Sequence, residues 1–137
     1  MTKVAVLTSE DGTERIVGMM NGYDGAEYER LKNSVAERFD ASFPGSGTDF
    51  RQVRETEAGE FYLDSAGVDP QMRSMGIGSR LFEAMFAKAA GAGFHTVGLI
   101  VDEDKPKAEA LYRRLGFEVK GIKDFFGHKM KHTQKTI

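Results

Sequence analysis

The sequence contains no cysteine, which excludes disulfides, thiolate nucleophiles and cysteine-ligated metals. No apolar run approaches the about 18 residues of a membrane span, and no charged segment followed by an apolar one opens the chain. These absences predict a cytoplasmic protein without a membrane partner. The three histidines, His95, His128 and His132, form no cluster with a carboxylate at helical spacing, so no metal site is predicted.

The composition predicts a single domain over residues 1–137. Of the 137 residues, 40% are apolar and 29% are charged, as in a folded chain with one core. Residues 105–137 carry 9 Lys and Arg against 3 Asp and Glu. This basic segment is either a solvated surface or an edge that meets a polyanionic small ligand. Residues 1–104 carry 10 basic against 18 acidic residues and no nucleic-acid motif, so we predict no nucleic-acid partner.

The first third of the chain predicts a hairpin followed by a helix. Apolar residues alternate over 3–23 on both sides of Asp11-Gly12, a turn signal, which is the pattern of a β-hairpin. Residues 26–40 predict a helix, because apolar residues recur there at spacings of three and four. That apolar stripe consists of Tyr28, Leu31, Val35 and Phe39. Residues 42–50 break the helix as a loop.

The rest of the chain alternates strands with helices. The expected elements are strands over 59–70 and 95–101, a helix from Ile77 to the glycines at 91–93, a helix over 106–116, and two strands around Gly127. A strand-helix-strand unit favours parallel pairing of its two strands, whereas the flanking hairpins favour antiparallel neighbours. The sequence therefore predicts an α/β fold with a mixed sheet and helices on both of its faces.

The segment "PQMRSMGIGSRL", residues 70–81, leaves a strand, turns on two glycines and starts a helix. The first turn of a helix has unpaired N–H groups that attract anions. Gly76 and Gly78 would let a bulky anion approach them, while Arg73 and Ser79 would add further donors. The alternative is a plain turn. The lysine of a nucleotide P-loop and the third glycine of a dinucleotide fingerprint are both absent, so neither of these motifs fits. From the donors of the turn we predict a pyrophosphate site.

Two motifs together resemble the GNAT superfamily of N-acyltransferases. Arg73-x-x-Gly76-x-Gly78 after "GVDP" is similar to its acyl-CoA pyrophosphate loop, and Ala108-x-x-Leu111-Tyr112-x-x-x-Gly116-Phe117 is similar to its later helix. The resemblance covers residues 3 to about 130. It implies a mostly antiparallel sheet with a central parallel strand pair that splays apart, and it implies acetyl-CoA as the acyl donor.

The resemblance also implies a set of residues that bind acetyl-CoA. Pantetheine would pair with the exposed backbone of one splayed strand, where Gly67 would mark a bulge, and pyrophosphate would rest on the glycine turn. Lys105 stands where the family often has Asn, and it would reach a phosphate or point to water. The implied residues are Ala66, Gly67, Val68, Arg73, Ser74, Met75, Gly76, Ile77, Gly78, Ser79, Lys105, Ala108 and Tyr112.

For catalysis, the resemblance implies that Tyr112 is the general acid that protonates the departing thiolate, and the sequence offers three candidates for the base. Glu60 and Asp64 lie four residues apart, so within a strand they would share one face and raise each other's pKa. His128 is the third candidate. The expected reaction is direct attack by the primary amine of a small molecule or peptide on acetyl-CoA. The alternatives are an acyl-CoA-binding or regulatory module without activity and a nucleic-acid adaptor.

This sequence departs from the family's usual pattern in its first elements. The family usually has a strand and two helices before its first hairpin, whereas this hairpin starts by residue 3. The resemblance thus implies that one wall of the acceptor site is absent and that apolar sheet surface is exposed. Because such surface tends to be buried by association, we predict a homodimer.

Overall fold

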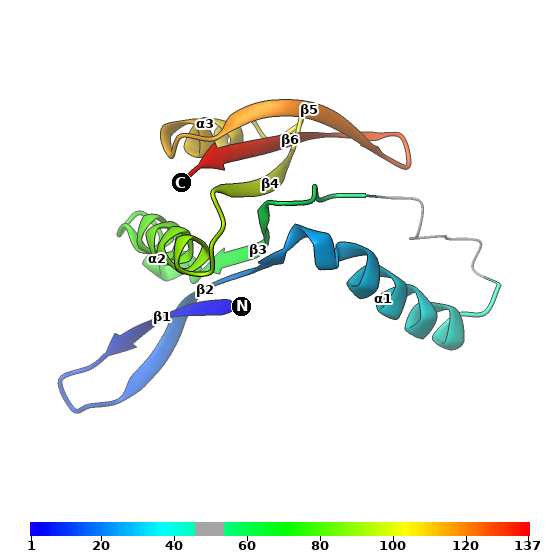
Figure 1. The fold of residues 1–137 in the computed structure, drawn as a ribbon. Coiled ribbons are helices and arrows are strands. Elements are labelled where there is room, and N and C mark those ends of the chain that lie inside the picture. The colour runs from blue at the N-terminus through cyan, green and yellow to red at the C-terminus, as the bar shows by residue number, and fades with distance from the viewer. Residues whose placement is uncertain (46–53) are drawn as a thin grey trace.

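The computed structural model describes residues 1–45 and 54–137 (Figure 1). The elements follow the predicted order: β1 (Thr2–Thr8), β2 (Glu14–Asp24), α1 (Tyr28–Ser42), β3 (Phe61–Val68), α2 (Ile77–Gly91), β4 (Thr96–Asp102), α3 (Pro106–Arg114), β5 (Glu118–Phe125) and β6 (His128–Thr136). Short 3-10 helices, η1 (Gly25–Glu27) and η3 (Pro70–Met72), precede α1 and α2. The predicted loop after α1 continues beyond residue 45, outside the described residues.

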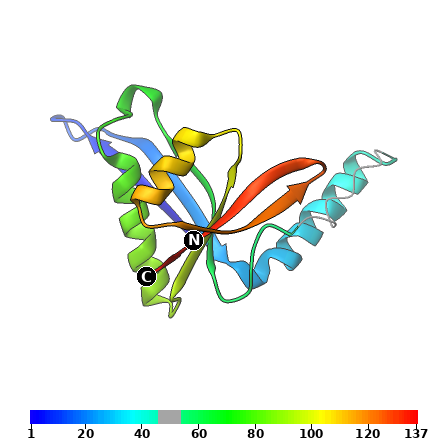
Figure 2. The same ribbon diagram turned by 90° about the horizontal axis from the view of Figure 1, so that it is seen from above.

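The six strands form one sheet in the order β1-β2-β3-β4-β6-β5. Among the strands of the described residues, only β3 and β4 pair in parallel, so the predicted mixed, mostly antiparallel sheet is confirmed. Their pairing is limited to Phe61 with Val97 and Tyr62 with Gly98. Beyond these two pairs the strands separate toward their carboxyl ends (Figure 2), which confirms the predicted splayed pair.

The core lies on the face of the sheet that α2 covers. Leu81, Phe82, Met85 and Ala89 of α2 are buried there, as their helical spacing predicts. They pack with strand residues Met20, Phe61, Leu63, Val97, Leu99 and Val101. Helix α3 joins the same face, because the ring of Tyr112 lies 5.9 Å from that of Phe82. Both helices therefore support one side of the splayed strands.

Helix α1 is present as predicted but does not lie flat on the sheet; it projects away from it (Figure 1). Its buried residues are Tyr28, Lys32 and Ala36, whereas Val35 of the predicted apolar stripe is 60% exposed. The ammonium of Lys32 lies 3.0 Å from a carboxylate oxygen of Glu29 and 5.3 Å from the centre of the Tyr28 ring. The spacing of its apolar residues thus predicts a helix but not which residues are buried.

Within residues 1–45 and 54–137, no helix is both long enough and apolar enough to cross a membrane.

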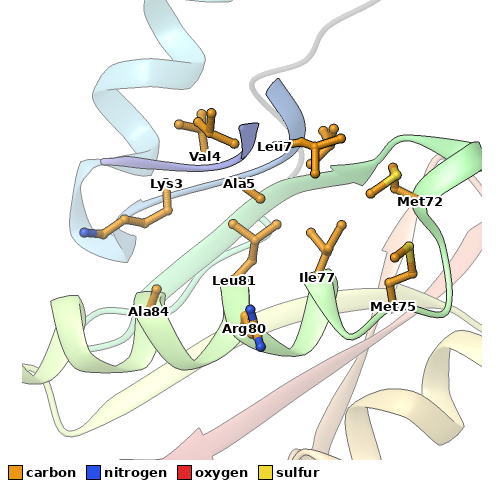
Figure 3. A pocket seen from close by; sticks show the side chains of 12 residues that line it. Lys3, Val4, Ala5, Leu7, Met72, Met75, Ile77, Arg80, Leu81 and Ala84 are labelled. Carbon is orange, nitrogen blue, oxygen red and sulfur yellow. The ribbon is translucent and has the colours of Figure 1, made fainter. Parts of the chain in front are cut away.

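The β1–β2 hairpin exposes several apolar side chains at the edge of the sheet. Val4, Val6, Ile16 and Met19 are 50%, 46%, 64% and 40% exposed. A cavity of about 420 Å³ lies between β1 and the first turns of α2 (Figure 3), where Leu7, Ile77 and Leu81 line it together with Met72 and Met75. The exposed apolar surface that the sequence predicts is thus present on this hairpin.

Dimer formation stays a prediction, and this hairpin is the surface on which we expect it. Static light scattering at micromolar concentration should give twice the monomer mass for the native chain and the monomer mass after the double substitution Val6→Asp and Ile16→Asp. Ile122→Asp is the control, since Ile122 is 51% exposed on β5, at the opposite edge of the sheet. A native monomer would contradict the prediction.

Candidate functional site

The glycine turn presents unpaired backbone donors at the start of α2. Gly76 is the N-cap residue of α2 and has a left-handed backbone with φ of 77°, which favours glycine. No side chain caps α2 among the described residues. The first-turn N–H groups, from Ile77 onward, therefore keep their partial positive charge available for a ligand.

The space in front of these donors is open. A Cβ atom built on Gly76 or Gly78 would have no heavy atom within 4 Å, and Arg73 and Ser79 are exposed beside them. Ser74 also has a left-handed backbone, with φ of 63°, so the chain turns sharply just before the glycines. We call the stretch Arg73–Ser79 the anion cradle, because its geometry suits a bulky anion; a ligand there stays a prediction.

The splayed strand β3 leads directly to the anion cradle. Ala66, Gly67 and Val68 pair with Met20, Met19 and Gly18 of β2, but their other edge faces β4 beyond the last β3–β4 pair. A ligand with amide groups could add to that edge as an extra strand would. The predicted residues 66–68 are thus at an unpaired edge of the described sheet.

The bulge expected at Gly67 lies instead at Asp64. Pairing between β2 and β3 passes from Asn21 opposite Ser65 to Gly22 opposite Leu63, which leaves Asp64 as the extra residue. The prediction for Gly67 was wrong, because a glycine in a strand does not by itself disturb the register. A bulge redirects side chains, and here it directs a carboxylate.

Tyr112 has its ring within the aromatic core. It lies 6.1 Å from the Phe117 ring and meets the Phe82 ring edge to face. Burial raises the pKa of the Tyr112 phenol above its ordinary value, which keeps the hydroxyl protonated at neutral pH. The residue is therefore in the state that a general acid needs, although its role stays a prediction.

The other two predicted cofactor residues on α3 lie in different surroundings. Ala108 packs against the core, and Lys105 is exposed at the N-cap of the helix. The backbone N–H of Lys105 donates to the carbonyl of Asp102 at 3.0 Å. Lys105 is thus free to reach toward solvent beside the carboxyl end of β4, whereas Ala108 has a packing role.

Glu60 is buried, with 1% of its surface exposed, and it lies just before β3 rather than within it. Its Oε1 accepts from the backbone N–H of Glu57 at 2.8 Å. Its Oε2 lies 2.9 Å from Nε2 of His132 and accepts from the Gln134 amide at 2.8 Å. Both carboxylate oxygens are therefore engaged by neighbours, which leaves Glu60 badly placed to take a proton directly from an incoming amine.

Asp64 lies in a different environment from Glu60. Desolvation raises the pKa of the Asp64 carboxyl above its ordinary value, and a hydrogen bond with the Asn21 side chain opposes the rise. The expected cause, repulsion between Asp64 and Glu60, is not what shifts this pKa. The expectation failed because Glu60 turns toward β4 and β6, whereas the bulge turns Asp64 toward β2.

Asp64 lines a cavity that the sequence did not predict. We call it the tyrosine cavity. Its volume is about 570 Å³, and its walls come from β2, α1, β3 and the β5–β6 turn. The lining residues are Asn21, Tyr23, Tyr28, Leu31, Lys32, Val35, Glu55, Asp64, Phe125 and Phe126. These residues come from four parts of the chain, so no local motif could reveal them.

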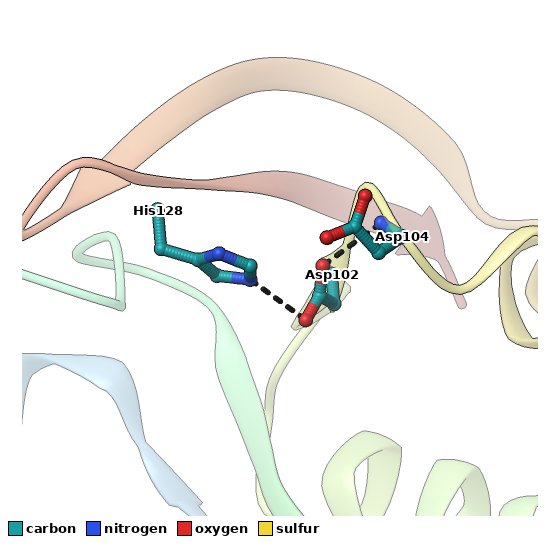
Figure 4. Close-up of side chains that lie close together, drawn as sticks. All are labelled: Asp102, Asp104 and His128. Atoms are coloured by element: carbon teal, nitrogen blue, oxygen red, sulfur yellow. Dashed lines mark hydrogen bonds and ion pairs between the residues drawn. The ribbon is translucent and has the colours of Figure 1, made fainter.

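The third candidate base, His128, forms a close pair with Asp102. Its Nε2 lies 2.7 Å from Oδ2 of Asp102, at the carboxyl end of β4 (Figure 4). That hydrogen bond raises the pKa of the His128 imidazole. The pKa of the Asp102 carboxyl is lowered, mainly by the hydrogen bond that it accepts from the Asp104 backbone N–H and secondly by the hydrogen bond with His128. Asp104 adds a second carboxylate, and the possible ligand atoms of the three residues lie within 4.8 Å of one another.

Among the described residues, this trio is the one group of three His, Asp or Glu side chains close enough together to hold a metal ion. Helical spacing could not indicate it, because the residues come from the end of β4, the following turn and the start of β6. In the structure, the side chains of His128 and Asp102 are hydrogen-bonded to each other, and the three side chains are mostly exposed.

The order of elements, the splayed strands and the anion cradle agree with one known family. The model of the acetyltransferase (GNAT) family matches residues 3–117, most of the chain. The chain belongs to the GNAT acetyltransferase family. The family assignment that the two sequence motifs predict is thereby confirmed.

Curated GNAT relatives match part of the chain. Mycothiol acetyltransferase of Paenarthrobacter aurescens is 39% identical over 67 residues, which are 49% of this chain and 20% of the relative. Mycothiol acetyltransferase of Kocuria rhizophila is 40% identical over 75 residues, 55% of this chain and 22% of the relative. The chain thus spans about a fifth of the length of these relatives.

Solved GNAT structures match nearly the whole chain. A crystal structure of an acetyltransferase superposes with a TM-score of 0.69 at 29% identity, covering 98% of this chain and 69% of that one. The N-acetyltransferase from Staphylococcus aureus Mu50 gives a TM-score of 0.71 at 18% identity, covering 96% and 68%. The second likeness shows the GNAT fold alone.

The buried Glu60 carboxylate lies so close to Gly98 that we expect no larger residue to fit at position 98. A Cβ atom at Gly98 would collide with the Glu60 carboxylate, so Gly98→Ala should lower the free energy of unfolding by about 1–3 kcal/mol, as measured by urea denaturation. Gly121→Ala is the matched strand control, since a Cβ there meets no atom within 4 Å. Equal losses in both variants would refute this account of Gly98.

Proposed function

We propose that the protein transfers an acetyl group from acetyl-CoA to a primary amine by direct attack within a ternary complex. The observation that carries the proposal is the open anion cradle at the start of α2, which continues from the unpaired edge of β3. Family membership supports acyl transfer. The identity of the donor, the acceptor and the catalytic groups belongs to the proposal.

In this proposal the pyrophosphate of acetyl-CoA binds the N–H groups of the anion cradle, with Arg73 adding a charged donor. The pantetheine arm, which carries two amides, pairs with the backbone of Ala66–Val68. The edge of β3 at Ala66–Val68 leads into the anion cradle, so a single extended ligand could bind to both. The thioester end would then lie toward the point where β3 and β4 meet.

The acid and the base approach this point from opposite faces of the sheet. Tyr112 packs on the face that α2 covers. Asp64 faces the tyrosine cavity, which α1 borders on the other side. An amine held in the cavity and a thiolate on the α2 side would therefore be separated by the acyl carbon, as direct attack requires.

The proposed reaction transfers one acetyl group, and the attacking nitrogen loses two protons. Asp64 takes the first proton from the ammonium, and the amine nitrogen then forms a bond to the acyl carbon. The C–S bond breaks as Tyr112 gives its proton to the thiolate of CoA, and the second proton of the nitrogen restores the Tyr112 phenol through water. Asp64 releases its proton to solvent. Holding both reactants in line can contribute about 7 kcal/mol or more to catalysis.

We assign Glu60 a positioning role rather than the direct base role that its sequence position suggested. Its bonds to His132 and Gln134 tie the start of β3 to β6, across the buried Gly98 of β4. These bonds hold the point from which β3 and β4 separate. Asp64 is the better candidate for the base, because its pKa is raised and it faces a cavity.

The role of the anion cradle can be tested by placing a side chain where the ligand is proposed to bind. Gly78→Val should weaken acetyl-CoA binding about tenfold or more, because each lost hydrogen bond to a charged group contributes about 1.5–3 kcal/mol. Isothermal titration calorimetry gives the dissociation constant. Gly91→Val, at the other end of α2 and also without neighbours within 4 Å of a new Cβ, should bind acetyl-CoA normally.

Normal binding in Gly78→Val would remove the cradle from the proposal. Binding of acetyl-CoA without thiol release across a panel of amines would instead favour the alternative, an acyl-CoA-binding module without transfer activity.

The acid role of Tyr112 is tested by removing its hydroxyl. Tyr112→Phe keeps the ring that packs on Phe82 and Phe117, so the fold and acetyl-CoA binding should persist. Turnover should fall about 100-fold or more, the usual contribution of a general acid, as measured by thiol release. Turnover equal to that of the native chain would show that the thiolate leaves without help from Tyr112.

A further inference from the structure

Resting on the proposed function, we infer that the tyrosine cavity is the acceptor site and that it selects a primary amine carried on an aromatic or alkyl group. The ammonium would bind Asp64, and the apolar group would pack among the rings of the cavity. The acceptor would thus be a small monocation, not a polyamine or an amino acid.

Most of the cavity wall is apolar or aromatic. Tyr23 of β2 lines it together with Tyr28, Leu31 and Val35 of α1, and Phe125 at the end of β5 and Phe126 in the following turn complete the apolar lining. Such walls bind an apolar group by removing its surface from water. Its volume of about 570 Å³ lies within the range of small-molecule sites.

Two carboxylates line the cavity, Glu55 and Asp64, and Asp64 is the one beside the splayed strands. Glu55 accepts a hydrogen bond from the Tyr62 hydroxyl at 2.8 Å, and Lys32 forms an ion pair with Glu29 at 3.0 Å. Asp64 interacts with the neutral amide of Asn21. A single ammonium can therefore pair with Asp64 and lie against the faces of the neighbouring tyrosines.

The same arrangement disfavours other amines. The carboxylate of an amino acid would lie near Asp64 and Glu55 and be repelled by both. Beyond Asp64, the lining offers the second ammonium of a polyamine only Glu55, whose carboxylate already accepts from the Tyr62 hydroxyl, so this ammonium would lose hydration against the aromatic wall with incomplete compensation. Selection thus follows from both the sign and the number of charges.

Asp64 is also placed where the acetyl group is expected. It lies two residues beyond Tyr62, the last residue of β3 that pairs with β4, and the bulge at this position turns it beside Asn21. An ammonium bound to Asp64 would therefore lie at the point where the splayed strands separate. This joins the acceptor cavity to the donor cleft.

The first experiment compares acceptors on the full chain. Thiol release and mass spectrometry would give kcat/KM for 2-phenylethylamine, hexylamine, spermidine, phenylalanine and a short peptide with an N-terminal phenylalanine. We expect the first two amines to exceed the other three by at least about tenfold, since lost burial or an unpaired charge costs more than about 1.4 kcal/mol. A preference for spermidine, phenylalanine or the peptide would overturn the inference.

Two variants test the cavity itself, with binding as the readout. Calorimetry with 2-phenylethylamine on the CoA-saturated protein should show at least about tenfold weaker binding for Asp64→Asn, which removes the charge. Phe126→Ala should also weaken it, whereas Phe43→Ala should not, since Phe126 and Phe43 are 64% and 59% exposed but Phe126 alone of the two lines the cavity. Unchanged binding in both cavity variants would place the amine elsewhere and refute the inference.

The two readouts separate this inference from the proposed function. Binding of 2-phenylethylamine that depends on Asp64, without any thiol release, would retain the acceptor cavity and remove the transfer reaction. Efficient acetylation of spermidine, with no binding of 2-phenylethylamine, would retain the reaction and remove the inferred selectivity.

Discussion

The short parallel contact between β3 and β4 is the constraint on which the rest of the site depends. Two residue pairs join the strands, Phe61 with Val97 and Tyr62 with Gly98, and then the sheet opens. Helices α2 and α3 each follow one of the diverging strands. Their separation therefore places the anion cradle at one side of the gap and the Tyr112 helix at the other, while the edge of β3 remains unpaired.

Much of this arrangement could be predicted from the sequence, because it follows from local signals. Glycines with positive φ at Gly12, Gly76 and Gly127 mark the turns where the sequence indicated them, and the apolar spacing of α2 identifies its buried face. Two separate motifs at a fixed order were enough to indicate the family that the comparison confirms. Local signals are therefore enough to predict the glycine turn that forms the anion cradle.

The surroundings of Asp64 could not be predicted in the same way. The bulge at Asp64 is a property of the pairing between two strands, and neither strand alone shows it. Helix α1 buries Lys32 and exposes Val35, although Val35 belongs to the apolar stripe from which the buried face was predicted. The tyrosine cavity and the pair of His128 with Asp102 both join segments that are distant in sequence.

The buried Glu60 carboxylate has a mechanical consequence for the gap between the strands. Its bonds to the Glu57 backbone, His132 and Gln134 fasten the narrow end, with Gly98 closely underneath. Any widening that admits a long ligand must therefore pivot about this fixed end. A ligand that separated the far ends of the strands would leave the spacing at this end, and with it the neighbouring carboxylate of Asp64, unchanged.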